Sequence, residues 1–78
     1  MRFDTIELTL AVHAETKGAL LVSETGEEMR AVWLPRSQIE IAASSKTTRG
    51  TDRNGQMVTL PLIEMRVPEW LAKDKGLV

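Results

Sequence analysis

The sequence predicts a mainly β protein with one short C-terminal helix, arranged as a five- to six-stranded antiparallel sheet or a small barrel. Apolar and polar residues alternate along residues 5–13, which is the period of a strand with one buried face. Several short apolar runs follow, separated by turns that contain Gly, Ser or Asn. Only residues 68–75 have the pattern of a helix. Together these three observations indicate the fold class.

The chain has 78 residues, which predicts a single domain over residues 1–78, close to the lower size limit for a hydrophobic core. A chain this short buries roughly 60% of its unfolded surface, so a homodimer is a natural supplement. The absence of Cys excludes disulfides and thiolate metal sites, and it fits a reducing cytoplasm. The N-terminal region alternates and has no long apolar run, so we expect a cytoplasmic protein without signal peptide or membrane span.

The first predicted strand, residues 5–13, directs four aliphatic side chains to one face: Ile6, Leu8, Leu10 and Val12. His13 falls on the polar face, and we interpret it as a solvated histidine at the strand end, because a metal site needs further ligands and a triad needs a positioned nucleophile. A turn at 15–18, a central strand at 19–22 and an acidic turn at 23–28 follow. The acidic turn lacks the ligand spacing of a calcium loop, so we interpret it as a solvated loop tip.

The third predicted strand runs from Met29 to Leu34 and ends at Pro35, which cannot donate a ladder hydrogen bond and turns the chain. The alternation then resumes at Ile39. Trp33 shares a strand face with Met29, and we expect it to be a core residue on which the C-terminal helix docks.

Residues 44–56 form a long polar stretch, which predicts a flexible loop. The stretch carries Lys46, Arg49 and Arg53 against a single acid, charges that suit a phosphate or a nucleic-acid backbone. It has no aromatic residue to stack a base and no P-loop glycine pattern. The other interpretation is a solvated hairpin tip, closed by Asn54-Gly55 as a two-residue turn.

The last predicted strand, residues 57–67, is the longest extended segment. Its apolar residues change parity between Leu62 and Ile63, which reverses the buried face. The change predicts a bend or bulge near Pro61–Ile63, as in the strands of small barrels.

The predicted helix, residues 68–75, begins with Pro, carries the i,i+4 pair Glu69 and Lys73, and is followed by a Gly stop. A helix of two turns is marginal in water. We therefore expect it to pack on the sheet through Trp70 and Leu71.

The chain carries little catalytic chemistry, with no Tyr, no Cys and a single His. No pair of carboxylates is placed by the sequence on one buried face, as acid–base catalysis requires. Ser37 lacks the flanking glycines of a nucleophile elbow. We therefore expect a protein that is not an enzyme and that holds neither metal nor cofactor.

The net charge of −1 is too balanced for a surface that neutralises phosphates throughout. The two halves differ, however. Residues 1–45 hold seven acids against four bases, giving −3, whereas residues 46–78 hold six bases against four acids, giving +2. One interpretation is that this charge asymmetry steers a charged partner toward the protein. The other is that the solvated surface charges are distributed this way by chance.

Three segments, taken in order, resemble a recurrent set of small phage and prophage proteins, most of which have no assigned activity. The resemblance covers roughly residues 15–41 and 57–77 and implies a phage context more than a mechanism. The stretch 44–56 departs from the pattern and looks like an insertion. The segments are a Glu-Thr-Lys strand start at 15–22, a Trp-Leu-Pro-Arg-Ser-Gln corner at 33–38 and a Pro-Glu-Trp-Leu-Ala helix at 68–72.

Two functions of different classes are compatible with these features. The first is a non-catalytic inhibitor that binds a host protein complex, similar to the phage proteins of the anti-CRISPR kind that block a CRISPR–Cas effector. The second is a single-stranded nucleic-acid-binding accessory protein of small-barrel type, and a virion structural or assembly factor is a third alternative. Nucleic acid is the less favoured partner, because the chain has only three aromatic residues. The residues predicted to contact a partner are Glu24, Glu27, Glu28, Lys46, Arg49, Arg53 and Trp70.

Overall fold

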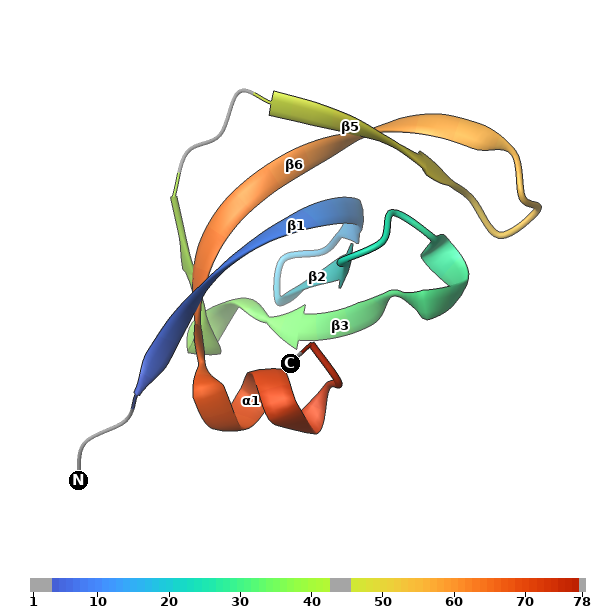
Figure 1. Cartoon of the computed structure of the whole chain (residues 1–78). Coiled ribbons are helices and arrows are strands. Elements are labelled where there is room, and N and C mark those ends of the chain that lie inside the picture. Colours follow the sequence, from blue (N-terminus) through green and yellow to red (C-terminus); the bar gives the residue numbers. More distant parts are fainter. Residues whose placement is uncertain (1–3, 43–45, 78) are drawn as a thin grey trace.

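The computed structural model of the protein describes residues 4–42 and 46–77. Within these residues six strands form one antiparallel sheet, and a short α-helix follows the last strand (Figure 1). The predicted fold class is therefore confirmed. In chain order the elements are β1 (Thr5–Glu15), β2 (Ala19–Ser23), the 3-10 turn η1 (Glu28–Arg30), β3 (Val32–Pro35), the 3-10 turn η2 (Arg36–Gln38), β4 (Glu40–Ile41), β5 (Lys46–Thr51), β6 (Met57–Pro68) and α1 (Glu69–Asp74).

The two long strands, β1 and β6, organise the sheet. The strand order is β3-β2-β1-β6-β4, and β5 also pairs with β6. The N-terminal half of β1 pairs with β6 and its C-terminal half pairs with β2. β6 changes partner at Leu62, which pairs with Lys46 of β5 and with Ala11 of β1. Figure 1 shows β6 as a strongly curved strand, and the bend predicted near Pro61–Ile63 coincides with its change of partner.

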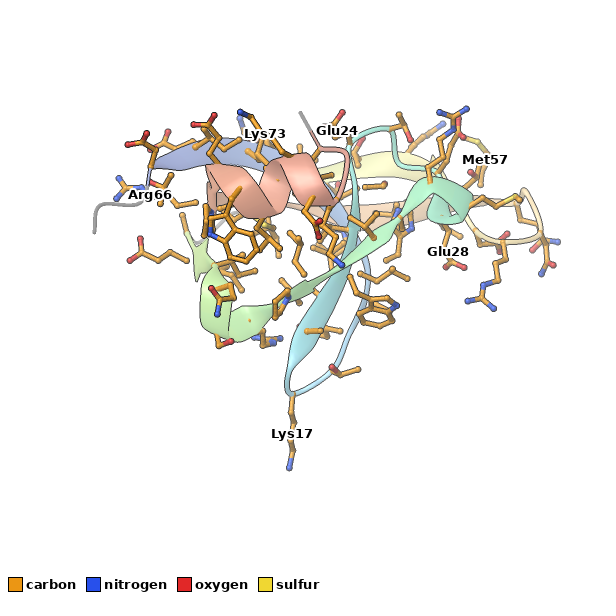
Figure 2. The ribbon with its side chains drawn as sticks, turned by 90° about the horizontal axis from the view of Figure 1, so that it is seen from below. Lys17, Glu24, Glu28, Met57, Arg66 and Lys73 are labelled. Atoms are coloured by element: carbon orange, nitrogen blue, oxygen red, sulfur yellow. The ribbon has the colours of Figure 1, made fainter. Side chains whose placement is uncertain are left out.

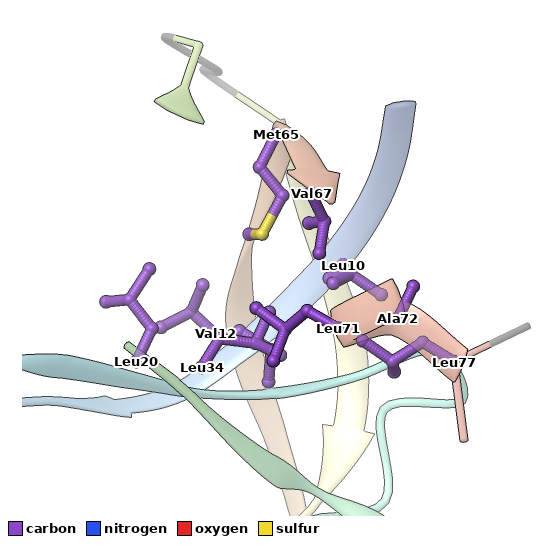
Figure 3. Packing of buried hydrophobic residues seen from close by; sticks show 10 residues of the cluster. Leu10, Val12, Leu20, Leu34, Met65, Val67, Leu71, Ala72 and Leu77 are labelled. Carbon is purple, nitrogen blue, oxygen red and sulfur yellow. The ribbon is translucent and has the colours of Figure 1, made fainter. Parts of the chain in front are cut away.

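One face of the sheet and the inner side of α1 form the hydrophobic core (Figure 3). The strands contribute alternate residues to this face, because successive side chains of a strand point to opposite sides. Each fully buried aliphatic side chain contributes roughly 1.5–3 kcal/mol, so packing stabilises a helix that is too short to persist alone. The buried cluster comprises Leu10, Val12, Leu20, Val22, Leu34, Met65, Val67, Leu71, Ala72 and Leu77.

The C-terminal end of α1 follows the predicted pattern, whereas Pro68, predicted as the first helical residue, has a non-helical ψ of 136° and precedes the helix as its N-cap. The predicted pair of Glu69 and Lys73 forms, with Oε1 and Nζ 2.9 Å apart. At the C-terminal end Gly76 adopts a φ of 74°, and the N–H of Leu77 donates to the carbonyl of Ala72 at 2.8 Å. This reversal returns Leu77 to the core. Across residues 4–42 and 46–77, no helix reaches the length and hydropathy needed to cross a membrane.

The expected positions of both tryptophans are wrong. β3 pairs Leu34 with Leu20, so Leu34 faces the core and is fully buried, whereas Trp33 points to the other face and is 45% exposed. Trp70 is 51% exposed, and only Leu71 of the predicted docking pair is buried. The helix therefore packs on aliphatic side chains, and both indoles lie at the surface.

The third strand also begins later than predicted. Residues 28–30 form η1, in which the N–H of Ala31 donates to the carbonyl of Glu28 at 3.0 Å, a 3-10 hydrogen bond in place of a ladder bond. Met29 is consequently 81% exposed instead of lying within a strand.

The loop predicted over 44–56 is mostly a hairpin. Residues 46–51 form β5 and pair with 57–62 of β6, while residues 44 and 45 lie outside the described residues. Asp52 closes the hairpin: its Oδ1 accepts the N–H groups of Asn54 and Gln56 at 2.8 and 3.0 Å. The stretch is polar because β5 lies at an edge of the sheet, and polarity alone does not distinguish an edge strand from a loop.

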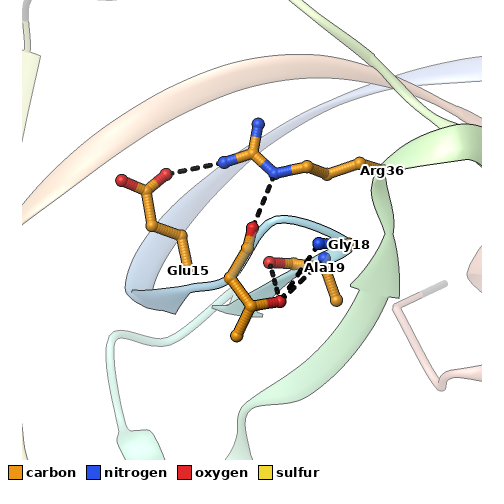
Figure 4. Close-up of polar contacts among 5 residues, drawn as sticks. Glu15, Gly18, Ala19 and Arg36 are labelled. Atoms are coloured by element: carbon orange, nitrogen blue, oxygen red, sulfur yellow. Dashed lines mark hydrogen bonds and ion pairs between the residues drawn. The ribbon is translucent and has the colours of Figure 1, made fainter.

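The Trp-Leu-Pro-Arg-Ser-Gln corner holds the β1–β2 turn (Figure 4). The Arg36 guanidinium donates from Nε to the carbonyl of Thr16 at 3.0 Å and from Nη2 to Glu15 Oε2 at 2.8 Å. The Thr16 hydroxyl in turn accepts the N–H groups of Gly18 and Ala19. The strand start at 15–22 and the corner at 33–38 are therefore in direct contact, and the contact is structural.

Candidate functional site

The structure brings the acidic turn and the basic hairpin together at one end of the molecule. Arg53 Nε lies 3.2 Å from Glu28 Oε2, with side chains 81% and 22% exposed respectively. Figure 2 shows Glu28 and Met57 at this end and Arg66 at the opposite end. The sequence places Glu28 and Arg53 in separate loops, and only the fold makes them neighbours.

Main-chain contacts fix this approach. The carbonyl of Gly26 accepts the N–H of Thr51 at 2.8 Å, and Glu27 forms an isolated parallel bridge with Thr51. A Cβ placed on Gly50 would lie 2.2 Å from the Gly26 oxygen and 2.5 Å from Leu60 Cδ1. Only glycine at position 50 permits so close an approach of the two backbones.

A buried polar pair supports the acidic turn from below. His13 Nε2 lies 2.7 Å from the hydroxyl of Ser23, which also accepts the N–H of Gly26 at 2.9 Å. His13 sits where the β1–β2 register shifts between Val12 and Ala14, so it is the extra residue of a bulge.

The interpretation of His13 as a solvated histidine is therefore wrong. Its Nδ1 is buried and has no hydrogen-bond partner among the described residues. Burial lowers the pKa of His13 below its ordinary value, while the negative charge of Glu28 opposes that shift. Ser23 is only 1% exposed, so its hydroxyl is shielded from any substrate. The pair positions the loop.

A hollow of about 380 Å³ is lined by the Glu28–Arg53 pair and by apolar residues. The apolar residues include the half-exposed Trp33 and the exposed Met29. We call this region the Trp33 surface, and its residues are Leu21, Glu28, Met29, Ala31, Trp33 and Arg53.

The other residues predicted to contact a partner are dispersed. Glu27 pairs with Arg30 at 3.4 Å, and Glu24 lines a separate shallow hollow near the C-terminal end of α1. Lys46 and Arg49 lie along β5, outside the Trp33 surface. Trp70 lies on α1 and is not part of the Trp33 surface.

Sequence reasoning missed Trp33 and Met29 as surface residues. Their parity alternates with that of Val32 and Leu34, and both registers contain apolar side chains. A signal was present: the Val32 and Leu34 register is purely aliphatic, like the core residues of β2, whereas Met and Trp are enriched at interfaces. Which of these residues is buried depends on which residue of β3 lies opposite Leu20 of β2. That pairing is set by the tertiary structure.

The opposite end of the sheet carries a second groove, of about 420 Å³, and half of its lining residues are charged. Arg66 lies there 3.4 Å from Glu7 and 3.9 Å from Glu40, and all three side chains are exposed. Exposed ion pairs of this kind contribute little binding energy. Within the described part of the chain, no group of three or more His, Asp or Glu side chains is placed to hold a metal ion.

No protein-family model, curated protein or solved structure matches this chain.

Proposed function

We propose that this protein is a non-catalytic binding protein that acts on a host protein complex through the Trp33 surface. The observation that carries this proposal is an exposed Trp33 and Met29 in one hollow, bordered by the Glu28–Arg53 ion pair. An apolar centre with a charged rim is the composition of a protein interface, where Trp, Met and Arg are enriched.

The fold does not need these side chains for its core. Leu34 fills the core position of β3. Trp33 lies on the other face of the strand, opposite buried Leu21, and 45% of its surface stays exposed to solvent. Exposed apolar surface gathered in one place commonly marks an interaction site.

The nature of the partner comes from the resemblance of residues 15–41 and 57–77 to small phage proteins. In its most specific form, the proposal is a defence inhibitor of the anti-CRISPR kind that covers a surface of a Cas effector in the host cytoplasm. The acidic turn does not act alone, because Glu27 and Glu28 are paired with Arg30 and Arg53. Trp33 supplies the central contact.

The test combines capture from host lysate with a phage interference assay in cells with an active CRISPR–Cas system. We expect the wild-type protein to retain a Cas subunit and to restore phage growth, and Trp33→Ala to lose both. Ile41→Ala removes another exposed apolar side chain, on β4, and is the matched control. Capture of no defence component, together with unchanged interference, would overturn the inhibitor assignment.

A second candidate function is single-stranded nucleic-acid binding. The observation that favours it is the outward-facing ring of Trp33 with Arg53 lining the same hollow, an aromatic platform beside a cation. The nearby carboxylate of Glu28 opposes a phosphate backbone, so we rank this function second. A gel shift with short single strands at low salt tests it, and absence of a shift at micromolar protein removes it.

A further inference from the structure

The Arg53 guanidinium occupies a position that an external cation can take. Its Nε lies 3.2 Å from the carboxylate of Glu28, which is 22% exposed and lines the same hollow as the ring of Trp33. A carboxylate and an aromatic ring that line one hollow can together bind a guanidinium or ammonium group, which pairs with the acid and stacks on the ring. Within the chain, the Arg53 guanidinium supplies the cation that pairs with the carboxylate.

Arg53 is not needed to shape the hairpin that carries it. The turn is closed by Asp52, whose carboxylate accepts the N–H groups of Asn54 and Gln56. The N–H of Gly55 also donates to the carbonyl of Asp52 at 3.0 Å. The side chain of Arg53 is 81% exposed, so replacing it on Glu28 leaves the backbone unchanged.

The main chain of Glu28 is positioned independently of Arg53. Glu28 begins η1, and its carbonyl accepts the N–H of Ala31 at 3.0 Å. The preceding Gly26 is held to Thr51 by a main-chain hydrogen bond of 2.8 Å. Removing the guanidinium would therefore leave the carboxylate on a fixed main chain, in the hollow that Trp33 also lines.

We propose that the Trp33 surface binds an arginine or lysine side chain of a partner protein, whose cationic group replaces the Arg53 guanidinium on Glu28. This inference rests on the proposed function and specifies the chemistry of the partner segment. The exchange costs little, because the arginine side of the pair is exposed and the Glu28 carboxylate is paired with a cation before and after the exchange. The partner segment gains the stacking contact with Trp33, so Arg53 acts as an internal competitor.

The direct test is an NMR titration with the peptide acetyl-Gly-Arg-Gly-amide. The protein has two indole N–H groups, so Trp33 reports on the hollow and Trp70, on α1, is the internal control. We expect the peptide to shift the Trp33 resonance, to bind Arg53→Ala roughly two- to fivefold more tightly than the wild type, and to leave Glu28→Gln unshifted. The matched acidic peptide acetyl-Gly-Glu-Gly-amide should shift neither indole.

Equal shifts with Glu28→Gln, equal affinity of Arg53→Ala and wild type, or an equal response to the acidic peptide would each overturn the inference. The proposed function is tested separately by capture of the host complex. If Trp33→Ala loses the complex while Glu28→Gln retains it, the binding function stands and the cation site is wrong. If Arg53→Ala binds the arginine peptide and no variant captures a complex, the cation site stands and the proposed function fails.

Discussion

Two arginines of this protein each pair with a glutamate beside a turn, but they differ in what else they hold. Arg36 contacts Glu15 at 2.8 Å and also donates to the main-chain carbonyl of Thr16 at 3.0 Å. Arg53 contacts the carboxylate of Glu28 at 3.2 Å, and its side chain is 81% exposed against 37% for Arg36. An arginine that donates a hydrogen bond to a main-chain carbonyl supports the fold. An arginine that pairs only with a carboxylate side chain can be replaced there by another cation.

The same distinction applies to the loops around the two arginines. Near Arg36, side chains secure the β1–β2 turn. Near Arg53, the loops are secured by main-chain contacts at Gly26 and Gly50 and by the Ser23 hydroxyl, and the side chains above them are exposed. The second arrangement leaves charged and aromatic groups available for a partner without weakening the loops that carry them.

The largest expected effect concerns the main-chain contact beneath the Trp33 surface. Gly50→Ala forces a Cβ to within 2.2 Å of the Gly26 oxygen, so we expect the free energy of unfolding to fall by about 3 kcal/mol. Urea denaturation measures this change. Gly18→Ala is the control, because a Cβ at Gly18 meets nothing within 4 Å. Equal stability of the two variants would contradict the close approach.

A smaller loss is expected from the arginine that holds main chain. Arg36→Ala removes the hydrogen bond to Thr16 and the pair with Glu15, and we expect a loss of about 1.5 kcal/mol in the free energy of unfolding. Arg36→Lys keeps the charge but not the two-point geometry, so it should recover only part of the loss. If Lys17→Ala destabilises the protein as much as Arg36→Ala, the contact is not supporting the turn.

The partly buried His13 predicts a pH dependence. Burial lowers the pKa of His13 in the folded protein below the ordinary value of 6.5, so the neutral form is favoured on folding. The stabilisation is complete above pH 6.5 and is lost as pH falls from 6.5 through the lowered pKa, because the unfolded chain binds the proton first. Unfolding free energies measured between pH 7.5 and 5 test this, and His13→Gln should flatten the slope.

The smallest effect is expected at Arg53. Its pair with Glu28 is exposed on the arginine side, so Arg53→Ala should change the free energy of unfolding by at most about 0.5 kcal/mol. The same denaturation series measures it. A loss as large as that of Arg36→Ala would remove the contrast between the two arginines and would make Arg53 a structural residue.

Much of the strand and helix pattern was predictable, because it depends on local periodicity. The alternation of residues 5–13, the helix with its Glu69–Lys73 pair and the bend of the last long strand all follow from neighbouring residues. The stretch 44–56 was mispredicted, because a polar edge strand has the composition of a loop. The predicted two-residue turn at Asn54-Gly55 is also wrong: Thr51 pairs with Met57, and residues 52–56 form the turn, with the N–H of Gly55 donating to the carbonyl of Asp52.

The site was only partly predictable. Glu28 and Arg53 were selected as charged loop residues, but their contact was not foreseen, because 25 positions separate them along the chain. Trp33 was assigned to the wrong face, because both registers of its strand are apolar. His13 looked like a surface residue until the bulge in β1 turned it toward Ser23.

By itself the sequence determined the fold class, the closing helix and the scarcity of catalytic groups, since composition and local periodicity decide these. Tertiary structure alone decided which face of β3 is buried, and therefore that Trp33 is exposed. It also brought the acidic turn into contact with the basic hairpin. It also decided that Arg36 supports main chain while Arg53 pairs at the surface. The physical reason is that strand register and the approach at Gly50 depend on pairings between distant segments, and no local pattern encodes which of two apolar faces a neighbouring strand will cover.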